Sequence, residues 1–111
     1  MSASQPPLPA PFTVSVAYDD GQAAVTPAGE LDLASADDLA REVRELWSSG
    51  ADPVVIDLRS LDFMDSSGLR SLLALRGTAD DDARHLELRP GPPTVQRIFD
   101  LTGTEQLFRW R

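Results

Sequence analysis

The feature of this sequence that most constrains its fold is a short apolar run preceded by the pattern of an amphipathic helix. The run is VVIDL, residues 54–58, and its near continuity is typical of a central strand that is covered on its faces. Over residues 36–47, apolar side chains recur every three or four positions, which predicts a helix with one buried face. A strand before this helix and a strand after it imply a right-handed β-α-β unit with parallel strands.

Upstream of this helix, alternating apolar and polar residues predict a β-hairpin. Residues 12–17 alternate, the stretch DDGQ around Gly21 favours a turn, and residues 23–28 return as a second strand. Pro27 has no amide hydrogen to donate to a neighbouring strand. We therefore expect Pro27 at a strand end or at an edge of the sheet.

The helix over residues 36–47 is expected to start after Ser35, as its N-cap, and to end at Gly50. In the remainder of the chain, glycine and proline mark the ends of helices and strands, and apolar periodicity distinguishes helices from strands. The predicted elements are a helix over residues 65–77 with Gly77 as its stop, a loop over 78–83, a half-exposed strand over 84–89, a helix over 92–103 and a short last strand over 106–110.

Together these elements predict an α/β fold. We expect a mixed sheet of four to five strands packed with three or more helices, in the order β-β-α-β-α-β-α with an optional last strand. The 111 residues suffice for one domain, which we place at residues 12–111. Residues 1–11 carry four prolines and no charged side chain, which is typical of a disordered tail; a polyproline II recognition segment is the other interpretation.

Composition excludes several classes of function. There are 18 acidic and 10 basic residues and the net charge is −8, so nucleic acid and anionic membranes, which need basic surfaces, are not expected as partners. Cysteine is absent, and His85 is the single histidine. No glycine-rich phosphate loop is present, so we expect no cofactor. The sequence shows neither a secretory signal nor a membrane span, which predicts a cytoplasmic protein.

Acidic and serine side chains gather where the predicted strands end. Asp32 follows the second strand, Asp62 and Asp65 follow the central strand, and Ser66 and Ser67 open the next helix. Functional groups of open α/β sheets gather outside the carboxyl ends of the strands, so we expect these side chains to share one surface. The same residues also suit plain caps and turns. The three carboxylates would suit Mg²⁺, but no spacing indicates such a site, and no metal is expected.

The two serines have three uses on this reasoning: a helix cap, a nucleophile or a phosphate acceptor. A hydrolase elbow reads G-x-S-x-G, whereas MDSSG has no glycine two positions before either serine. His85 is the single imidazole and is predicted on a strand, so the serines lack an evident base and we do not expect an enzyme. A helix N-terminus tolerates negative charge, and phosphorylation adds about −1.5 to −2 charges. A phosphate here would spare the fold and alter an interface.

Two motifs carry a resemblance to a known family. DFMDSSGL, which follows the apolar strand, and GELD at residues 29–32 resemble the STAS domain of bacterial anti-sigma-factor antagonists. The later VQRIFDLTG resembles the third helix of that family and its glycine stop, and the resemblance covers residues 12–110. It implies that the serine directly after the acid is phosphorylated by the partner, an anti-sigma factor that is also a serine kinase.

The resemblance places the phosphorylation site at Ser66, with Ser67 as the second choice. It implies that the unphosphorylated protein binds the anti-sigma factor and frees the sigma factor. Phosphorylation then breaks the complex, and a serine phosphatase resets it. Asp32 falls on the acid of a loop that faces the partner, and Asp65 shapes the acceptor loop. The residues expected to bind the partner are Glu30, Asp32, Asp62, Met64, Asp65, Ser66, Ser67 and Arg70.

Arg70 departs from the family, which often has a small residue at this position. An arginine one helical turn past Ser66 is placed to pair with its phosphate, to contact an acidic partner or to stay solvated. STAS domains also serve other roles, so the sequence leaves an alternative function. That alternative is a scaffold or sensor subunit that binds a regulatory or transport complex without phosphorylation.

Overall fold

The computed structural model describes residues 11–111, so the expectation for the proline-rich tail lies, apart from Pro11, outside the described residues. The chain also forms two short 3₁₀ turns, η1 (Leu58–Ser60) and η2 (Glu105–Leu107). The helices and strands are β1 (Thr13–Asp19), β2 (Gln22–Leu31), α1 (Ala36–Ser48), β3 (Val54–Asp57), β4 (Leu61–Met64), α2 (Ser66–Asp81), β5 (Leu86–Arg89), α3 (Pro93–Thr102) and β6 (Arg109–Trp110).

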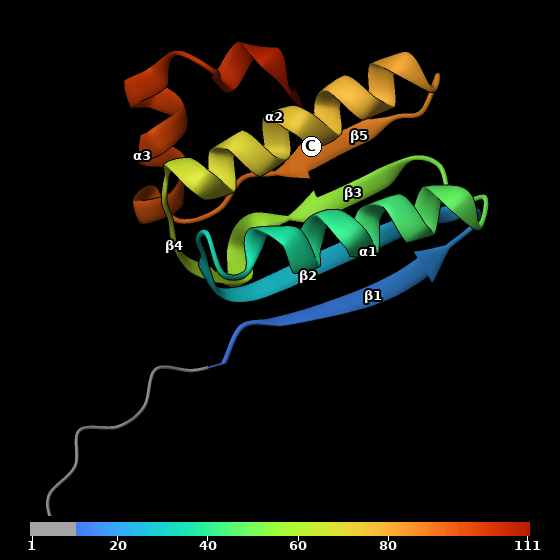
Figure 1. The fold of residues 1–111 in the computed structure, drawn as a ribbon, viewed down its shortest axis with the longest axis horizontal. Helices are drawn as coiled ribbons and strands as arrows, with labels where there is room; N and C mark the ends of the chain where they lie inside the picture. Colours follow the sequence, from blue (N-terminus) through green and yellow to red (C-terminus); the bar gives the residue numbers. More distant parts are fainter. Residues whose placement is uncertain (1–10) are drawn as a thin grey trace, which may run out of the picture.

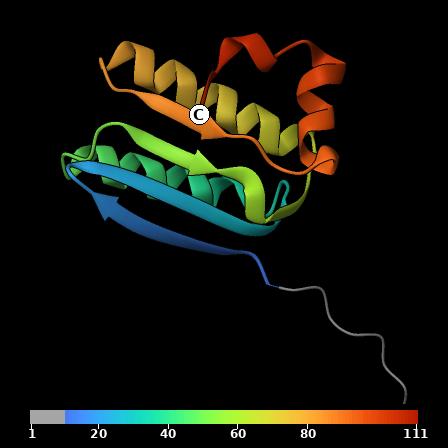
Figure 2. The ribbon, with the colours of Figure 1, turned by 180° about the vertical axis from the view of Figure 1, so that it is seen from behind.

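The strands form one six-stranded mixed sheet in the order β1-β2-β3-β5-β6, with β4 paired to β2 beside this path. β1 is antiparallel to β2, and every other pair is parallel. Helices α1 and α2 lie side by side on one face of the sheet (Figure 1), and the view from behind shows the strands in front of them (Figure 2). The predicted α/β fold with a mixed sheet is confirmed, with six strands in place of four to five.

The strand that the sequence did not predict is β4. It has only four residues, and two of them, Asp62 and Phe63, are exposed, so it shows neither an alternating pattern nor an apolar run. β3 pairs with the first half of β2 and, after η1, β4 pairs with the last residues of the same strand. Asp62 therefore lies in a strand, not in the loop that we expected after the central strand.

Pro27 lies inside β2, so the expectation that it marks a strand end or a sheet edge is wrong. β2 pairs with β3 as far as Val25 and with β4 from Gly29 onward. Pro27 falls in the interval where β2 changes its parallel partner. This interval explains how a residue without an amide hydrogen is accommodated in an interior strand.

Helix α2 continues through Gly77 to Asp81, so Gly77 is not its stop. An interior glycine costs a helix about 1 kcal/mol relative to alanine. The flanking Leu75 and Ala79 are 1% and 3% exposed, and their burial outweighs that cost. The left-handed residue after the helix is Ala83, with φ 54°, which residue type alone would not suggest.

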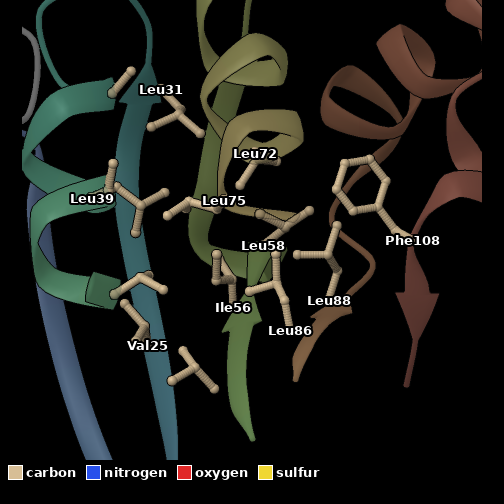
Figure 3. Packing of buried hydrophobic residues seen from close by; sticks show 14 of the residues in the cluster. Val25, Leu31, Leu39, Ile56, Leu58, Leu72, Leu75, Leu86, Leu88 and Phe108 are labelled. Carbon is tan, nitrogen blue, oxygen red and sulfur yellow. The ribbon is translucent and has the colours of Figure 1, made fainter. Parts of the chain in front are cut away.

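The hydrophobic core lies between the sheet and helices α1 and α2. Figure 3 shows Leu39 of α1 and Leu72 and Leu75 of α2 beside Val25 of β2 and Ile56 of β3. All five side chains are at most 1% exposed. Burying one such side chain stabilises the fold by roughly 1.5–3 kcal/mol. This packing holds the N-terminus of α2 above the sheet.

The last predicted strand exists as β6, which pairs with β5, but it is shorter than the expected 106–110, because residues 106 and 107 belong to η2. An aromatic cluster anchors it: the ring of Phe99 lies 5.6 Å from that of Phe108 and 5.0 Å from that of Trp110, both edge-on. The indole Nε1 of Trp110 donates to the carbonyl of Glu105 at 2.8 Å. Helix α3 ends at Gly103, as predicted, in a left-handed conformation with φ 68°.

Candidate functional site

The candidate site lies where β2 and β4 end together at one edge of the sheet. Leu31 is the register partner of Met64, and the amide of Asp65 donates to the carbonyl of Leu31 at 3.2 Å. The β2–α1 loop and the N-terminus of α2 are therefore neighbours. We expected Asp32 and Asp65 to follow adjacent parallel strands; they do, but the strand before Asp65 is β4 and not the central strand β3.

In the β2–α1 loop, the Asp32 carboxylate is used by the loop itself. Its Oδ1 accepts hydrogen bonds from the amides of Ala34 at 3.0 Å and Ser35 at 3.2 Å, and from the Ser35 hydroxyl at 3.1 Å. Ser35 Oγ also donates to the Glu30 carbonyl at 2.7 Å. Ser35 is the N-cap residue of α1, but its side chain makes no cap hydrogen bond. It ties the loop back to β2 instead.

The backbone conformation at Gly29 explains why the GELD motif begins with glycine. Gly29 has φ 103°, a conformation that residues with a side chain rarely adopt, and the register of β2 against β4 shifts between Gly29 and Glu30. A Cβ at Gly29 would also lie 3.3 Å from Phe12 Cα. The shift lets β2 end beside β4, with Glu30 exposed.

At the start of α2, Asp65 is the N-cap. Its Oδ1 accepts from the amides of Ser67 at 2.9 Å and Gly68 at 3.1 Å. Of the three uses considered for the serine pair, the helix cap therefore belongs to neither serine, because the carboxylate of Asp65, one residue before them, performs the capping. Ser66 is the first residue of the helix and is exposed, and its hydroxyl makes no hydrogen bond to any residue in 11–111. Ser67 is only partly exposed.

Gly68, the glycine of the DSSG motif, lets the helix approach the strands. A Cβ at this position would lie 2.7 Å from the Leu31 carbonyl oxygen and 2.7 Å from Met64 Cγ. Any side chain would push α2 away from the ends of β2 and β4. The close approach at Gly68 therefore fixes how near the first turn of α2, with Ser66, lies to the ends of β2 and β4.

Met64 does not belong to the exposed surface on which we expected it. Its side chain is 2% exposed and lies in the hydrophobic core. Asp62 remains exposed, and its carbonyl accepts a hydrogen bond from Thr94 Oγ1 at 2.9 Å, which joins β4 to α3.

Two exposed apolar residues near the site were missed by the sequence reasoning. Leu33, next to Asp32, is 79% exposed, and Phe63 of β4 is 47% exposed. An apolar residue within the polar loop between a strand and a helix was the available signal for Leu33. Phe63 carried no such signal, because its strand was not predicted.

A shallow groove of about 240 Å³ lies between α1 and α2 next to Ser67. Leu33, Ser67 and Arg70 contribute to its lining, and Ser71 Oγ donates to the Ala36 carbonyl at 3.3 Å, joining the two helices. Arg70 is exposed and forms no ion pair with any residue in 11–111. Its guanidinium is therefore available one helical turn from Ser66.

Neither a catalytic serine nor a metal site is supported by the geometry of the described residues. His85 precedes β5 beyond the far end of α2, and the 16 residues of that helix span about 24 Å, so His85 is not placed to act as a base for Ser66. The carboxylates of Asp32, Asp62 and Asp65 do not form a metal-binding group; within residues 11–111 no three acidic or histidine side chains do.

Among the described helices, none combines the length and the apolar character that crossing a membrane requires.

Comparison with known proteins agrees with this architecture. The family model described as "Mlab, STAS domain" matches residues 14–109. The anti-sigma-F factor antagonist RsfB of Mycobacterium tuberculosis is 31% identical over 101 residues, which cover 91% of this chain and 82% of that protein.

Solved structures show the same fold. The crystal structure of an anti-sigma factor antagonist from Mycobacterium paratuberculosis has a TM-score of 0.81 and 28% identity, covering 93% of this chain and 89% of that one. The anti-sigma factor antagonist SpoIIAA in its unphosphorylated form has a TM-score of 0.73 and 21% identity, covering 89% of this chain and 88% of that one. By sequence and by fold, the chain belongs to the STAS domain family.

Proposed function

We propose that this protein is a cytoplasmic anti-sigma-factor antagonist controlled by phosphorylation of Ser66. In its unphosphorylated form it binds an anti-sigma factor that is also a serine kinase, and the sigma factor is released. Phosphorylation dissociates the complex, and a serine phosphatase restores it. The protein acts by binding and not as an enzyme. The relative that is named an anti-sigma-F factor antagonist, at 31% identity, supports the general role.

The observation that carries the proposal is the state of the Ser66 hydroxyl. It is exposed on the first residue of α2 and is bound by no other residue in 11–111, while the cap of the helix is supplied by Asp65. A kinase can therefore modify Ser66 without removing a hydrogen bond from the fold. Ser67 is less exposed, and its amide is held by the cap.

The partner surface that we propose surrounds this hydroxyl. Leu33 and Phe63 supply apolar contact area, and Glu30, Asp62 and Arg70 supply exposed charge. Exposed apolar side chains beside polar ones are typical of protein interfaces. Asp32 and Asp65 shape the two loops through their own hydrogen bonds, so their part in binding is mainly to position neighbouring groups.

A phosphate on Ser66 acts on this surface by charge. Two added negative charges about 6 Å from one partner carboxylate, at an effective dielectric constant of about 40–80, cost roughly 1.4–2.8 kcal/mol. That free energy corresponds to about a ten- to hundredfold loss of affinity. Salt screens part of it, so the loss is expected to shrink at high ionic strength.

The test combines phosphorylation with binding. Incubated with ATP and the anti-sigma factor from the same cell, the wild type and Ser67→Ala are expected to gain one phosphate, and Ser66→Ala none, by intact-mass spectrometry. Calorimetry should then show at least a tenfold weaker complex for the phosphorylated wild type. Equal labelling of Ser66→Ala at Ser67 would refute the assigned site. Tight binding without any phosphorylation would instead support the scaffold or sensor alternative.

A further inference from the structure

A second site lies at the end of α2 opposite Ser66, and we propose that it binds a small organic phosphate. The cavity has a volume of about 270 Å³. It is bounded by the C-terminal half of α2, by the residues that lead into β5, and by η2 with β6. Since α2 is about 24 Å long, this cavity is separate from the acceptor serine.

The charge of this cavity is opposite to that of the molecule. Its lining includes Arg76, Arg84 and Arg109 against one carboxylate, Asp80, a formal charge of +2 with His85 neutral. The whole chain carries −8. Three of ten basic residues therefore gather at one small cavity of an acidic protein, where they create a local attraction for anions.

Within residues 11–111, these guanidinium groups have few close acidic partners. Arg84 and Arg109 form no ion pair with any residue in 11–111, although the charge of Arg84 acts on the nearby carboxylate of Asp52. Arg76 reaches Asp80 at 3.8 Å, and both side chains are well exposed, at 42% and 64%. An exposed pair at this distance contributes little, so Arg76 remains available to a ligand. His85 instead faces Asp52, with its Nδ1 3.1 Å from Oδ2.

Apolar side chains form part of the cavity floor. Ala79, Leu86 and Phe108 line it and are each at most 8% exposed, and Leu107 stands at the rim at 41% exposure. A ligand that fills the cavity therefore presents an anionic group to the arginines and an apolar group to this floor. The volume is slightly below the range of about 300–1,000 Å³ for drug-sized ligands, which indicates a smaller molecule.

Phosphate fits the cationic lining better than carboxylate does. The three arginines come from three separate segments, and each can donate paired hydrogen bonds to an oxygen-rich anion. A carboxylate has two oxygens and one charge, which a single arginine can satisfy. A phosphate monoester carries up to two charges and three terminal oxygens, so it offers one acceptor oxygen for each of the three segments.

The test uses the full chain and phenyl phosphate as the probe. Titration followed by ¹⁵N NMR is expected to show saturable shifts at the amides that line the cavity and none at Ser66. Phenol should cause no such shifts, and benzoate should bind at least several-fold more weakly than phenyl phosphate. Benzoate binding as tightly as phenyl phosphate would overturn the assignment of the ligand class.

Paired variants separate the cavity from general charge effects. Arg84→Gln combined with Arg109→Gln is expected to weaken phenyl phosphate binding at least tenfold. Arg44→Gln combined with Arg97→Gln removes the same charge from exposed arginines outside the cavity and should change binding less than twofold. Thermal unfolding without ligand checks that both proteins are folded. Equal losses in the two double variants, or shifts centred on Ser66, would refute the site.

Discussion

Replacing Gly68 with alanine is expected to destabilise the protein, whereas the same replacement at Gly77 should stabilise it. Both glycines lie in α2, so both changes gain about 0.5–1 kcal/mol of helix propensity. At Gly77 no atom of residues 11–111 outside the adjacent helix backbone lies within 4 Å of the added Cβ, so the gain in helix propensity is retained. Each variant adds one methyl group to the same helix, so the two differ only in its position and each is the control of the other.

At Gly68 the added methyl meets atoms that cannot move freely. It would lie 2.7 Å from the Leu31 carbonyl oxygen, and that carbonyl is already held by the amide of Asp65. It would also lie 2.7 Å from Met64 Cγ, in a side chain that is 2% exposed. Overpacking of this kind costs about 1–3 kcal/mol, more than the helix propensity returns. We expect a net loss of about 1–2 kcal/mol.

Urea unfolding followed by far-UV circular dichroism measures both effects. Gly68→Ala should lower the midpoint and Gly77→Ala should raise it, with the slope m unchanged in both. In thermal unfolding, a change of 1 kcal/mol corresponds to a shift of about 4–8 °C for a domain of about this size. Equal stability of the Gly68→Ala variant and the wild type would show that α2 can shift without cost, and would refute the packing argument for the DSSG glycine.

Two further predictions concern the surface and pH. Leu33→Ser should weaken anti-sigma-factor binding at least tenfold in calorimetry and leave urea stability unchanged, whereas Leu101→Ser, at a similarly exposed leucine on α3, should change neither. The side-chain hydrogen bond from Arg59 lowers the pKa of Asp57 below its ordinary 3.8. Its stabilisation is therefore complete above pH 3.8 and disappears as pH falls through the lower folded pKa. The Tm advantage of the wild type over Asp57→Asn should narrow below about pH 4; a constant difference would contradict this.

Helices and strands with a strong apolar periodicity were predictable from the sequence. A strand that forms only because a neighbouring strand offers a free edge was not predictable. Helix α1 and strand β3 have long or dense apolar patterns, so local sequence determines them. β4 exists because the end of β2 is free to pair with it, and that opportunity depends on the register shift after Gly29. The local sequence of residues 61–64 gives no sign that the end of β2 is available for pairing.

The site residues were predictable as a group but not in their individual roles. The stretch Asp65, Ser66, Ser67 contains three residues of two types, aspartate and serine, that both cap helices well, so sequence alone cannot select among them. The structure assigns the cap to Asp65, because its carboxylate reaches two amides of the first turn. Met64 was expected at the interface because of its position in the motif, but at the end of β4, beside Leu31 of β2, its side chain lies in the core.

The division of roles in the first turn of α2 would allow the phosphorylation that we propose for Ser66 to alter binding without altering the fold. Asp65 and Gly68 fix the helix to the ends of β2 and β4, and neither interaction involves the Ser66 hydroxyl. A phosphate on Ser66 would lie at a helix N-terminus, where the dipole favours negative charge and offsets repulsion from nearby carboxylates. The phosphate would therefore cost little free energy in the isolated protein. Its electrostatic cost would arise mainly in the complex, where a partner surface approaches and water is excluded. A switch of this kind needs a rigid support and an unused hydroxyl at the same position, and the DSSG sequence provides both.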